Sequence, residues 1–220
     1  MAVTGLAAGA VITGFSYPVV AKYTASSGSV SYSSGQLLAR GVSVSPSIET
    51  TGGDNNVFYA NNGAAEEAQR RFRRGTATFT VDGLLRAAEA LILGLPAQGS
   101  ITVSTGTTVA VQSYGDDQNI PYCGVGYVVR RQSAGVVYYQ AVIYTKVRFG
   151  QFTPGAATEG DDIDWQTTEL EATMLRDDTA NHVWQIVSEP LATELEAYNV
   201  VRVKLGLAVA AAVPGNGASA

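Results

Sequence analysis

The sequence predicts a single domain of mainly β structure with one or two helices, and three observations support this prediction. The chain of 220 residues is rich in Val, Thr, Ser and Tyr and has 24 glycines, a composition typical of β proteins with many turns. A long stretch, 136–149, alternates apolar and mixed positions with the period of two that a β-strand requires. A shorter stretch, 82–95, instead carries apolar residues at helical spacing.

The centre of the predicted fold is a long β-hairpin. A strand over 122–131 turns near Gly135 and returns over 136–149, where the odd positions are apolar apart from Thr145 and are expected to face a core. The even positions form a mixed face. At roughly 3.3 Å per residue the return strand would span about 46 Å, against a radius of gyration of about 17 Å for a chain of this length, so it must bend or reach beyond one subunit. A third strand, 163–175, changes its apolar face midway, as a β-bulge would produce.

Local patterns predict the elements of the N-terminal part. Residues 1–12 are expected to form a flexible arm that precedes a single β domain over 13–207. Strands are predicted over 15–23, 30–32, 37–48 and 76–81, each bounded by turn-forming residues. Pro18 places the first of them at a sheet edge or at a strand start, because proline has no N–H to donate to a neighbouring strand.

The segment 49–75 shows no steady period and is predicted to form a long loop. A loop of this length is rare unless it is functional or disordered, and its aromatic and charged residues suit docking onto another surface. Arginines beside glutamates in an acidic protein more often form salt bridges within or between subunits than a nucleic-acid patch, and both interpretations remain open. The candidate assembly-interface residues are Phe58, Tyr59, Glu66, Glu67, Arg70, Arg71, Phe72, Arg73 and Arg74.

A helix is predicted over 82–95, with Asp82 as its N-cap and with Gly94 and Pro96 ending it. Burying its apolar stripe on a sheet would contribute on the order of 10 kcal/mol gross, so the stripe is interpreted as core and not as a ligand site. The stripe consists of Leu84, Leu85, Ala88, Leu91, Ile92 and Leu95.

The C-terminal half adds a hairpin and a possible second helix. The Thr- and Val-rich segment 101–111 is predicted as a strand or a hairpin that turns near Gly106. Thr193 and Glu196 have the spacing of a capping box, which indicates a helix start. The β-branched valines at 200, 201 and 203 nevertheless leave helix and strand open there. Residues 208–220 are expected to form a flexible tail.

The sequence favours no catalytic, cofactor or metal site. His182 is the only histidine and Cys123 the only cysteine, so neither a catalytic triad nor a disulfide or cysteine-rich metal framework is expected. Gly124 and Gly126 lack the third glycine and the helix of a dinucleotide fingerprint. Three acidic clusters lack the spacing of a calcium loop. They are Asp116 and Asp117; Asp161, Asp162 and Asp164; and Asp177 and Asp178.

The charge and the hydropathy of the chain limit its partners. The formal charge is −5 and the isoelectric point is about 4.9, so there is no overall basic field to hold nucleic acid through its phosphates. No apolar run approaches the roughly 20 residues of a membrane helix, and no basic segment precedes the apolar N-terminus, so neither membrane insertion nor a signal peptide is expected.

Over roughly residues 12–190 the chain resembles the major tail protein, or tail tube protein, family of long non-contractile-tailed bacteriophages. The most specific motifs are GDDQNIPY, which begins at Gly115, and IDWQTTELEATMLRDD, which begins at Ile163. The arginine-rich run 70–74 departs from the Gly, Thr and Asn type of sequence expected there. The other matching stretches are GFSYPVVAKY (14–23), FYANNG (58–63), GTATFTVDGLLRAAEALILGL (75–95) and TKVRF (145–149).

The resemblance implies a β-sandwich or barrel flanked by a helix, six copies to a ring, and rings stacked into the tube through which double-stranded DNA passes. It also implies partners, namely the tape-measure, distal-tail and tail-terminator proteins of the same phage, and a place in the virion tail after assembly in the bacterial host cytoplasm. Six copies would carry a formal charge of −30, six times the −5 of one chain, so DNA would pass without specific binding.

In this interpretation the mixed face of 136–149 lies between subunits or faces the lumen, and its candidate residues are Tyr138, Gln140, Tyr144, Lys146 and Arg148. The alternative is a β-sandwich carbohydrate-binding module or hydrolase, in which exposed Tyr138, Tyr144 or Trp165 would contact the sugar.

Overall fold

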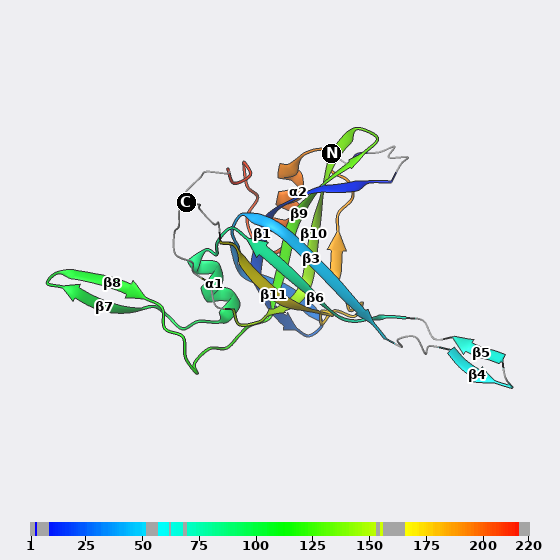
Figure 1. The fold of residues 1–220 in the computed structure, drawn as a ribbon, viewed down its shortest axis with the longest axis horizontal. Coiled ribbons are helices and arrows are strands. Elements are labelled where there is room, and N and C mark those ends of the chain that lie inside the picture. The colour runs from blue at the N-terminus through cyan, green and yellow to red at the C-terminus, as the bar shows by residue number, and fades with distance from the viewer. Residues whose placement is uncertain are drawn as a thin grey trace.

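The chain folds into an antiparallel sheet of eight strands with two helices, which confirms the predicted mainly β class with a flanking helix (Figure 1). The computed structural model describes residue 3 and residues 9–51, 57–61, 63–67, 70–152, 155 and 166–215, with backbone alone for 57–60 and 63–67. Along the sheet the strand order is β2-β1-β9-β10-β11-β6-β3, and β12 also pairs with β10. Among the described strands none joins β2 to β3, so the sheet stays open at these two edges.

The elements have the following bounds in chain order. The strands are β1 (Val11–Ser26), β2 (Ser29–Leu37), β3 (Gly41–Thr50), β4 (Val57–Ala60), β5 (Gly63–Glu67), β6 (Phe72–Val81), β7 (Gly99–Ser104), β8 (Thr107–Val111), β9 (Cys123–Ser133), β10 (Val136–Phe149), β11 (Thr168–Leu175) and β12 (Gln185–Val187). The helices are α1 (Arg86–Leu93) and α2 (Glu194–Lys204).

The predicted central hairpin is confirmed as β9 and β10. The two strands pair from Val136 opposite Ser133 to Val147 opposite Cys123. The turn between them uses Ala134 and Gly135, both with positive φ (47° and 83°), which is the backbone conformation that matches a two-residue hairpin to the twist of its strands. The hairpin therefore forms for the local reason that the sequence indicates.

A bulge in β10 bends this long strand and exchanges its two faces. Tyr144 pairs with Val125 and Val147 pairs with Cys123, so β10 has one extra residue between these pairs. Before the bulge, odd positions such as Ile143 belong to one core, and after it the odd position Val147 belongs to the other. The strand thus bends within one subunit instead of needing a neighbour to accommodate its length.

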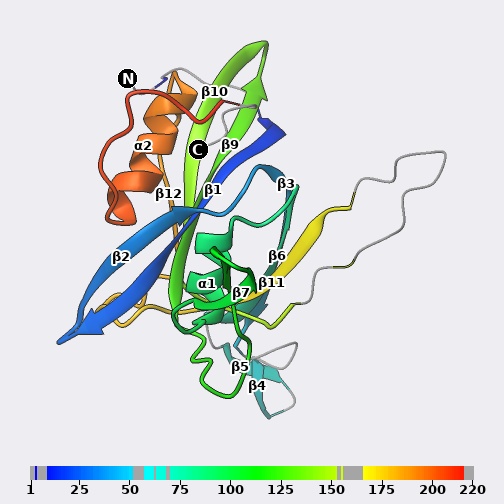
Figure 2. The ribbon, with the colours of Figure 1, turned by 90° about the vertical axis from the view of Figure 1, so that its left-hand side faces the viewer.

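Two hydrophobic cores lie on opposite faces of the sheet, and each is covered by one helix (Figure 2). The larger core joins α1 to β6, β9, β10 and β11. The smaller core joins α2 to β1, β9 and β10. The rings of Phe79 in β6 and Tyr127 in β9 meet edge to face with centroids 6.1 Å apart, although β10 and β11 separate their strands in the sheet. The sheet must therefore curl around the larger core.

Helix α1 is shorter than predicted, and the predicted cap is wrong. The helix starts at Arg86, with Leu85 as an N-cap that makes no side-chain hydrogen bond. The carboxylate of Asp82 instead accepts hydrogen bonds from the backbone N–H of Arg40, at 3.0 Å, and from its guanidinium. The predicted end is confirmed, because Gly94 takes the left-handed conformation with φ 60°.

The apolar stripe of α1 is only partly buried. Ala88 and Ile92 are fully buried, while Leu84, Leu91 and Leu95 pack against the core from its margin. Leu85 is exposed. Most of the stripe is therefore core, as predicted, but one of its members is not.

The second helix forms, and its predicted start is confirmed. Thr193 is extended (φ −125°, ψ 148°), and its hydroxyl accepts a hydrogen bond from the backbone N–H of Glu196 at 3.2 Å. The valines here were compatible with either a helix or a strand. Val201 is fully buried against the sheet, and Val203 is exposed. Packing on β9 and β10 therefore decides in favour of the helix.

Replacing Thr193 by alanine should lower the free energy of unfolding by about 1 kcal/mol, because an N–H of the first helical turn loses its acceptor. Urea denaturation of both proteins measures the change. Thr193→Ser, which keeps the hydroxyl oxygen, is the matched control and should stay within a few tenths of a kcal/mol of the original chain.

The N-terminal strands are longer than predicted. Pro18 lies inside β1, where the pairing with β9 shifts between Ser16 and Val19, and Tyr17 has a positive φ of 51°. The predicted edge or strand-start position is therefore wrong, because β1 lies between β2 and β9 and Pro18 lies in its interior. The irregular pairing there explains why the sheet tolerates this proline. The predicted strand 37–48 is divided, because the chain leaves β2 at Leu37 and begins β3 at Gly41.

Two hairpin arms project from the body in different directions (Figure 1). One is formed by β3 and β6 and continues into β4 and β5, so regular strands replace much of the long loop predicted over 49–75. The other is β7 with β8, which turns at Gly106 (φ 81°) and confirms the predicted hairpin. Among the described residues no helix is long and apolar enough to cross a membrane.

Candidate assembly surfaces

The base of the first arm is held together by contacts of the arginine-rich run. The backbones of Thr51 and Arg71 are joined by a hydrogen bond of 2.7 Å, and the Thr51 hydroxyl accepts a second one from the Arg71 N–H at 3.1 Å. The ring of Phe72 stacks on Trp184 with centroids 4.5 Å apart and planes 2° apart. Phe72 thus anchors the arm to the body of the protein.

The arginines of the arm differ in their surroundings. Arg74 makes a two-point contact with Glu49, from Nε to Oε2 at 2.8 Å and from a terminal nitrogen to Oε1 at 3.2 Å. This contact lowers the pKa of the Glu49 carboxyl. Arg70, Arg71 and Arg73 are exposed at the surface. The side chains of Phe58, Tyr59, Glu66 and Glu67, also predicted interface residues, lie outside the described part of the structure.

The structure brings one residue from each of the two predicted groups together in one basic hollow. Arg73 of the arm and Lys146 of β10 line the same surface pocket of about 440 Å³, with Thr51, Leu175 and Arg176. Three of these five residues are cationic. The guanidinium of Arg176 also donates to the carbonyl oxygen of Phe72, which ties the pocket to the base of the arm. An acidic group of a neighbouring molecule would match this pocket.

On β10 the predicted exposed face is wrong for its two tyrosines. Tyr144 is only 1% exposed and Tyr138 only 5% exposed, so neither faces a lumen, a neighbour or a sugar. The hydroxyl of Tyr144 lies 3.0 Å from that of Tyr127, and this hydrogen bond satisfies both groups inside the larger core. Trp165, the third residue of the carbohydrate interpretation, lies outside the described residues.

The other three predicted positions of β10 remain partly accessible. Gln140 is half-buried, and its amide donates to the carbonyl oxygen of Ser188 at 2.8 Å. Arg148 is exposed, and its guanidinium lies 5.9 Å from the centre of the Tyr122 ring. Lys146 lies over the same ring at 4.7 Å. Lys146 and Arg148 therefore share one side of β10, near the basic pocket.

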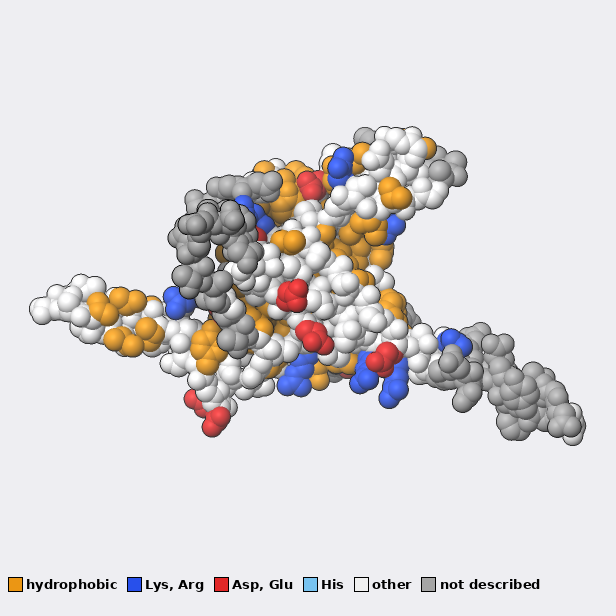
Figure 3. All heavy atoms as spheres, in the orientation of Figure 1, with side chains coloured by type: hydrophobic (Ala, Val, Ile, Leu, Met, Phe, Trp, Pro, Cys, Tyr) orange, Lys and Arg blue, Asp and Glu red, His pale blue; other side chains and the backbone are white. Residues whose placement is uncertain are grey.

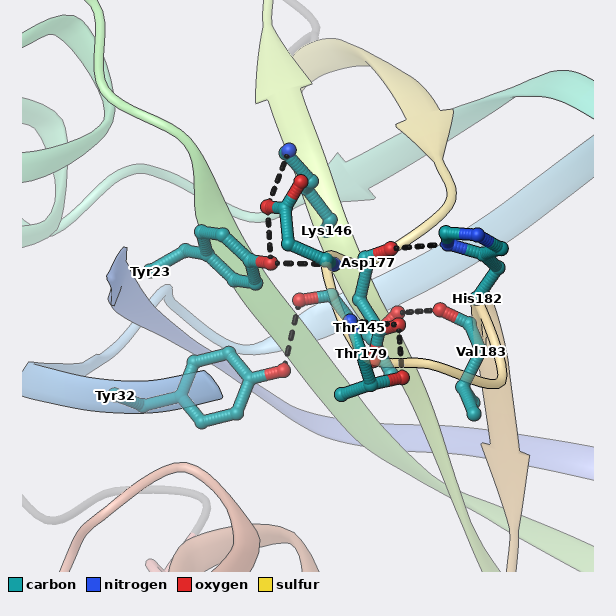
Figure 4. A network of polar contacts seen from close by, with 9 residues as sticks. Tyr23, Tyr32, Thr145, Lys146, Asp177, Thr179, His182 and Val183 are labelled. Atoms are coloured by element: carbon teal, nitrogen blue, oxygen red, sulfur yellow. Dashed lines mark hydrogen bonds and ion pairs between the residues drawn. The ribbon is translucent and has the colours of Figure 1, made fainter. Parts of the chain in front are cut away.

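Lys146 also belongs to a polar network that fastens the loop after β11 to the sheet (Figure 4). Its ammonium group contacts Asp178 Oδ2 at 2.7 Å, and the Tyr23 hydroxyl donates to the same oxygen at 2.6 Å. The Asp178 N–H in turn donates to the Tyr23 hydroxyl at 2.9 Å. These hydrogen bonds lower the pKa of the Asp178 carboxyl, Lys146 having the larger effect.

The second half of the network contains the only histidine. His182 is exposed, and its Nδ1 lies 3.3 Å from the backbone oxygen of Asp177 (Figure 4). The Asp177 carboxylate accepts from the Thr179 hydroxyl at 2.6 Å, and the Thr145 hydroxyl donates to the oxygen of Val183 at 2.6 Å. These bonds join neighbouring backbone segments, so a structural role accounts for each of them.

Burial of hydroxyl and thiol groups predicts sensitivity to alkali. Desolvation raises the pKa of Tyr23 to about 12 and the pKa of the Cys123 thiol to about 12, and it raises the pKa of Tyr32 and Tyr127 further. A folded-state pKa above the unfolded value stabilises the folded protein below the unfolded pKa, which is about 8.5 for Cys and 10 for Tyr. This stabilisation is lost as the pH rises through the folded pKa.

We therefore expect the free energy of unfolding to fall steadily between about pH 9 and pH 12. Denaturant unfolding across this range measures it. Tyr23→Phe should be less stable than the original chain near neutral pH, since Asp178 loses a donor, but should lose less between pH 10 and pH 12. A stability curve that stays flat to pH 12 in both proteins would contradict this expectation.

Two surfaces that were not among the predicted site residues also stand out. The β7–β8 arm is exposed from Gly99 to Ala110, and its exposed large apolar residues are Ile101, Val103 and Val109. An apolar hollow beside α2 contains Val200 and Val203. The hairpin had a sequence signal in its lack of charged residues. The hollow had none, because it combines residues of α2 with Leu191 outside the helix.

Within the described residues, no group of three or more His, Cys, Asp or Glu side chains could hold a metal ion. Asp161, Asp162 and Asp164 lie outside those residues. A scan against models of protein families finds no match to this chain. A search of curated protein sequences likewise finds no significant relative.

Proposed function

We propose that this chain is a structural subunit that assembles with copies of itself, six to a ring, into stacked rings that form the tail tube of a long-tailed bacteriophage. The observation that carries the proposal is a sheet left open at β2 and β3 in a molecule with two projecting arms. Open edges and exposed apolar arms are costly in a monomer, because they invite uncontrolled pairing and aggregation. They are useful when copies of the chain cover them.

The two edges favour a head-to-tail contact. They belong to different strands, so pairing β2 of one copy with β3 of the next is heterologous, and such a contact repeats until it closes a ring. β3 contains Pro46, and proline within a sheet is found mainly on edge strands, whereas β2 contains no proline. Pairing is therefore expected on either side of Pro46 and not across it.

The charge distribution suits a tube that passes DNA without holding it. A ring of six copies carries −30, while double-stranded DNA carries one negative charge per roughly 1.7 Å of its axis. The exposed arginines of the arm and the basic pocket are local exceptions that can meet acidic groups of a neighbouring subunit or ring. The proposed partners are further copies of the chain and the tape-measure, distal-tail and tail-terminator proteins, within the virion tail.

Negative-stain electron microscopy of the purified chain tests the proposal. At high concentration, or with its tail partners, the protein should form rings of about 6 subunits or tubes of stacked rings, as the closure of a head-to-tail contact requires. A chain that stays monomeric by sedimentation under all these conditions would overturn the proposal.

A further inference from the structure

The basic pocket at the base of the first arm is built from four separate parts of the chain. Thr51 follows β3, Arg73 belongs to β6, Lys146 belongs to β10, Leu175 ends β11 and Arg176 comes directly after it. In Figure 3, Lys and Arg side chains gather along the lower side of the body, toward the base of the arm at the right. The fold therefore assembles this pocket from residues that are distant in sequence.

The guanidinium of Arg176 is ordered by contacts of the protein itself. It donates to the carbonyl oxygen of Phe72, whose ring is stacked on Trp184. Arg176 is half-buried. A guanidinium has five N–H donors, more than this single bond uses. The bond thus orders the side chain while donors remain for a ligand.

The ammonium group of Lys146 is ordered in the same way. It contacts Asp178 at 2.7 Å and lies over the rings of Tyr23 and Tyr122, 5.2 and 4.7 Å from their centres (Figure 4). The Lys146 side chain is only 14% exposed. A cation that is already ordered loses less conformational entropy on binding a ligand than a mobile surface lysine does.

The charges at the pocket leave a positive excess. Asp178 contacts Lys146, so one carboxylate stands against the three cations of the lining, which leaves two positive charges. Glu49 is paired with Arg74, and this pair adds no net charge. A phosphate group carries about −1.5 to −2 at pH 7. Its charge therefore matches the excess at the pocket.

The donors of the pocket also suit the shape of a phosphate group. The Thr51 hydroxyl accepts a hydrogen bond from the Arg71 N–H at 3.1 Å and can itself donate one. Together with Arg73, Lys146 and Arg176 it supplies donors from the four parts of the chain that surround the pocket. Arginine and lysine are the side chains that most often bind phosphate oxygens. A tetrahedral group offers acceptor oxygens in several directions, whereas a planar carboxylate offers two.

We propose that this pocket binds one phosphate group, either as inorganic phosphate or on a small phosphate monoester. Its volume of about 440 Å³ lies within the range of 300–1,000 Å³ typical of small-molecule sites, so a monoester has room. The inference goes beyond the proposed function, because the free chain binds phosphate whether or not rings form. In an assembled tube, phosphate competes for the pocket with an acidic group of a neighbouring copy.

Isothermal titration calorimetry of the dilute chain with potassium phosphate, and separately with methyl phosphate, tests the site. Potassium chloride keeps the ionic strength constant. Binding should saturate with a dissociation constant of about 1 mM or lower. Arg73→Gln should weaken it at least tenfold, because one of the three cations is lost. Arg73→Lys should weaken it less, since it keeps the charge but not the planar fork.

The matched control is Arg86→Gln, which removes the same charge at an exposed position on α1 outside the pocket, and it should change the affinity by less than twofold. Phosphate should also raise the midpoint of thermal unfolding of the original chain and of this control, but not of Arg73→Gln. Binding that does not saturate by about 10 mM would overturn the proposal. Equal losses in the two variants would overturn it as well.

Two other anions test which group the pocket recognises. Succinate, a dicarboxylate, should bind at least tenfold more weakly than phosphate, and equal affinity would overturn the assignment to phosphate. Duplex DNA of about 20 base pairs should not displace phosphate, because its phosphodiesters carry a single charge each and the chain is acidic overall. DNA binding that is lost in Arg73→Gln would instead assign the pocket to nucleic acid.

These results separate the site from the tube. Rings formed by a chain that does not bind phosphate would refute only the site. Phosphate binding by a chain that never forms rings would refute only the tube.

Discussion

Replacing Phe79 by alanine should lower the free energy of unfolding by about 3–5 kcal/mol, the usual cost of deleting a buried aromatic ring. Phe79 is fully buried, and its ring meets those of Tyr127, Tyr144 and Phe149 at centroid distances of 6.1, 6.4 and 6.2 Å. These partners come from β10, which β11 alone separates from β6, and from β9, one strand further along the sheet. The variant should therefore lose the contact that holds the curl.

Guanidinium chloride denaturation of the two proteins measures this loss. Leu85→Ala is the matched control, since Leu85 is a large apolar residue of the same region but is exposed, and its effect should stay near 0.5 kcal/mol. A loss below about 1 kcal/mol for Phe79→Ala would show that the larger core refills the cavity. Phe79 lies on none of the proposed contact surfaces, so any folded fraction of the variant should still assemble.

Local patterns predicted the central hairpin well, because its causes are local. Gly135 permits the turn, and the alternation over β10 is visible in the residues themselves. The prediction for the second face of β10 is wrong for Tyr138 and Tyr144, because a tyrosine has both an apolar ring and a polar hydroxyl and its residue type alone does not decide whether it is buried. Tyr127 of β9 pairs with Val142, two residues before Tyr144 in β10, and its hydroxyl forms a hydrogen bond with the Tyr144 hydroxyl. This bond allows Tyr144 to be buried. That partner cannot be identified before the register of the two strands is known.

The cap of α1 shows a different limit. Asp82 has the residue type and the position of an N-cap, yet its carboxylate is bound to Arg40, which is distant in sequence and adjacent in the sheet. Long-range pairing therefore outweighs a local preference worth about 1 kcal/mol. The Thr193 cap has no such competitor in the contacts observed, and the local prediction is confirmed there.

The arm between β3 and β6 was predicted as a loop for a physical reason. A hairpin in solvent has no buried face, so the alternation that identifies strands is absent: β3 is exposed from Ser45 to Thr50. The sequence did single out the arginine-rich run and the basic end of β10. It could not show that Arg73 and Lys146 line one pocket, because only the curled sheet brings them together.

Reversing two charges of that arm, Arg71→Glu with Arg73→Glu, should impair ring stacking and reduce the yield of tubes by at least tenfold. Both side chains are exposed, so the stability of the isolated chain should change by no more than about 0.5 kcal/mol. Arg74 is left unchanged because its contact with Glu49 holds the base of the arm. Tube yield by electron microscopy and unfolding in urea measure the two effects separately.

The double variant also adds negative charge, which alone could oppose assembly of an acidic chain. Lys22→Glu with Arg86→Glu changes the net charge equally at exposed positions outside the arm, and it should leave the tube yield within about twofold if location matters. Equal losses in the two double variants would attribute the effect to overall repulsion. Unchanged yield in the arm variant would show that the arm is not an interface. A loss of tube yield confined to the arm variant would support acidic groups of a neighbouring copy as the partners of Arg71 and Arg73. In that case, raising the salt concentration should also weaken ring stacking of the original chain.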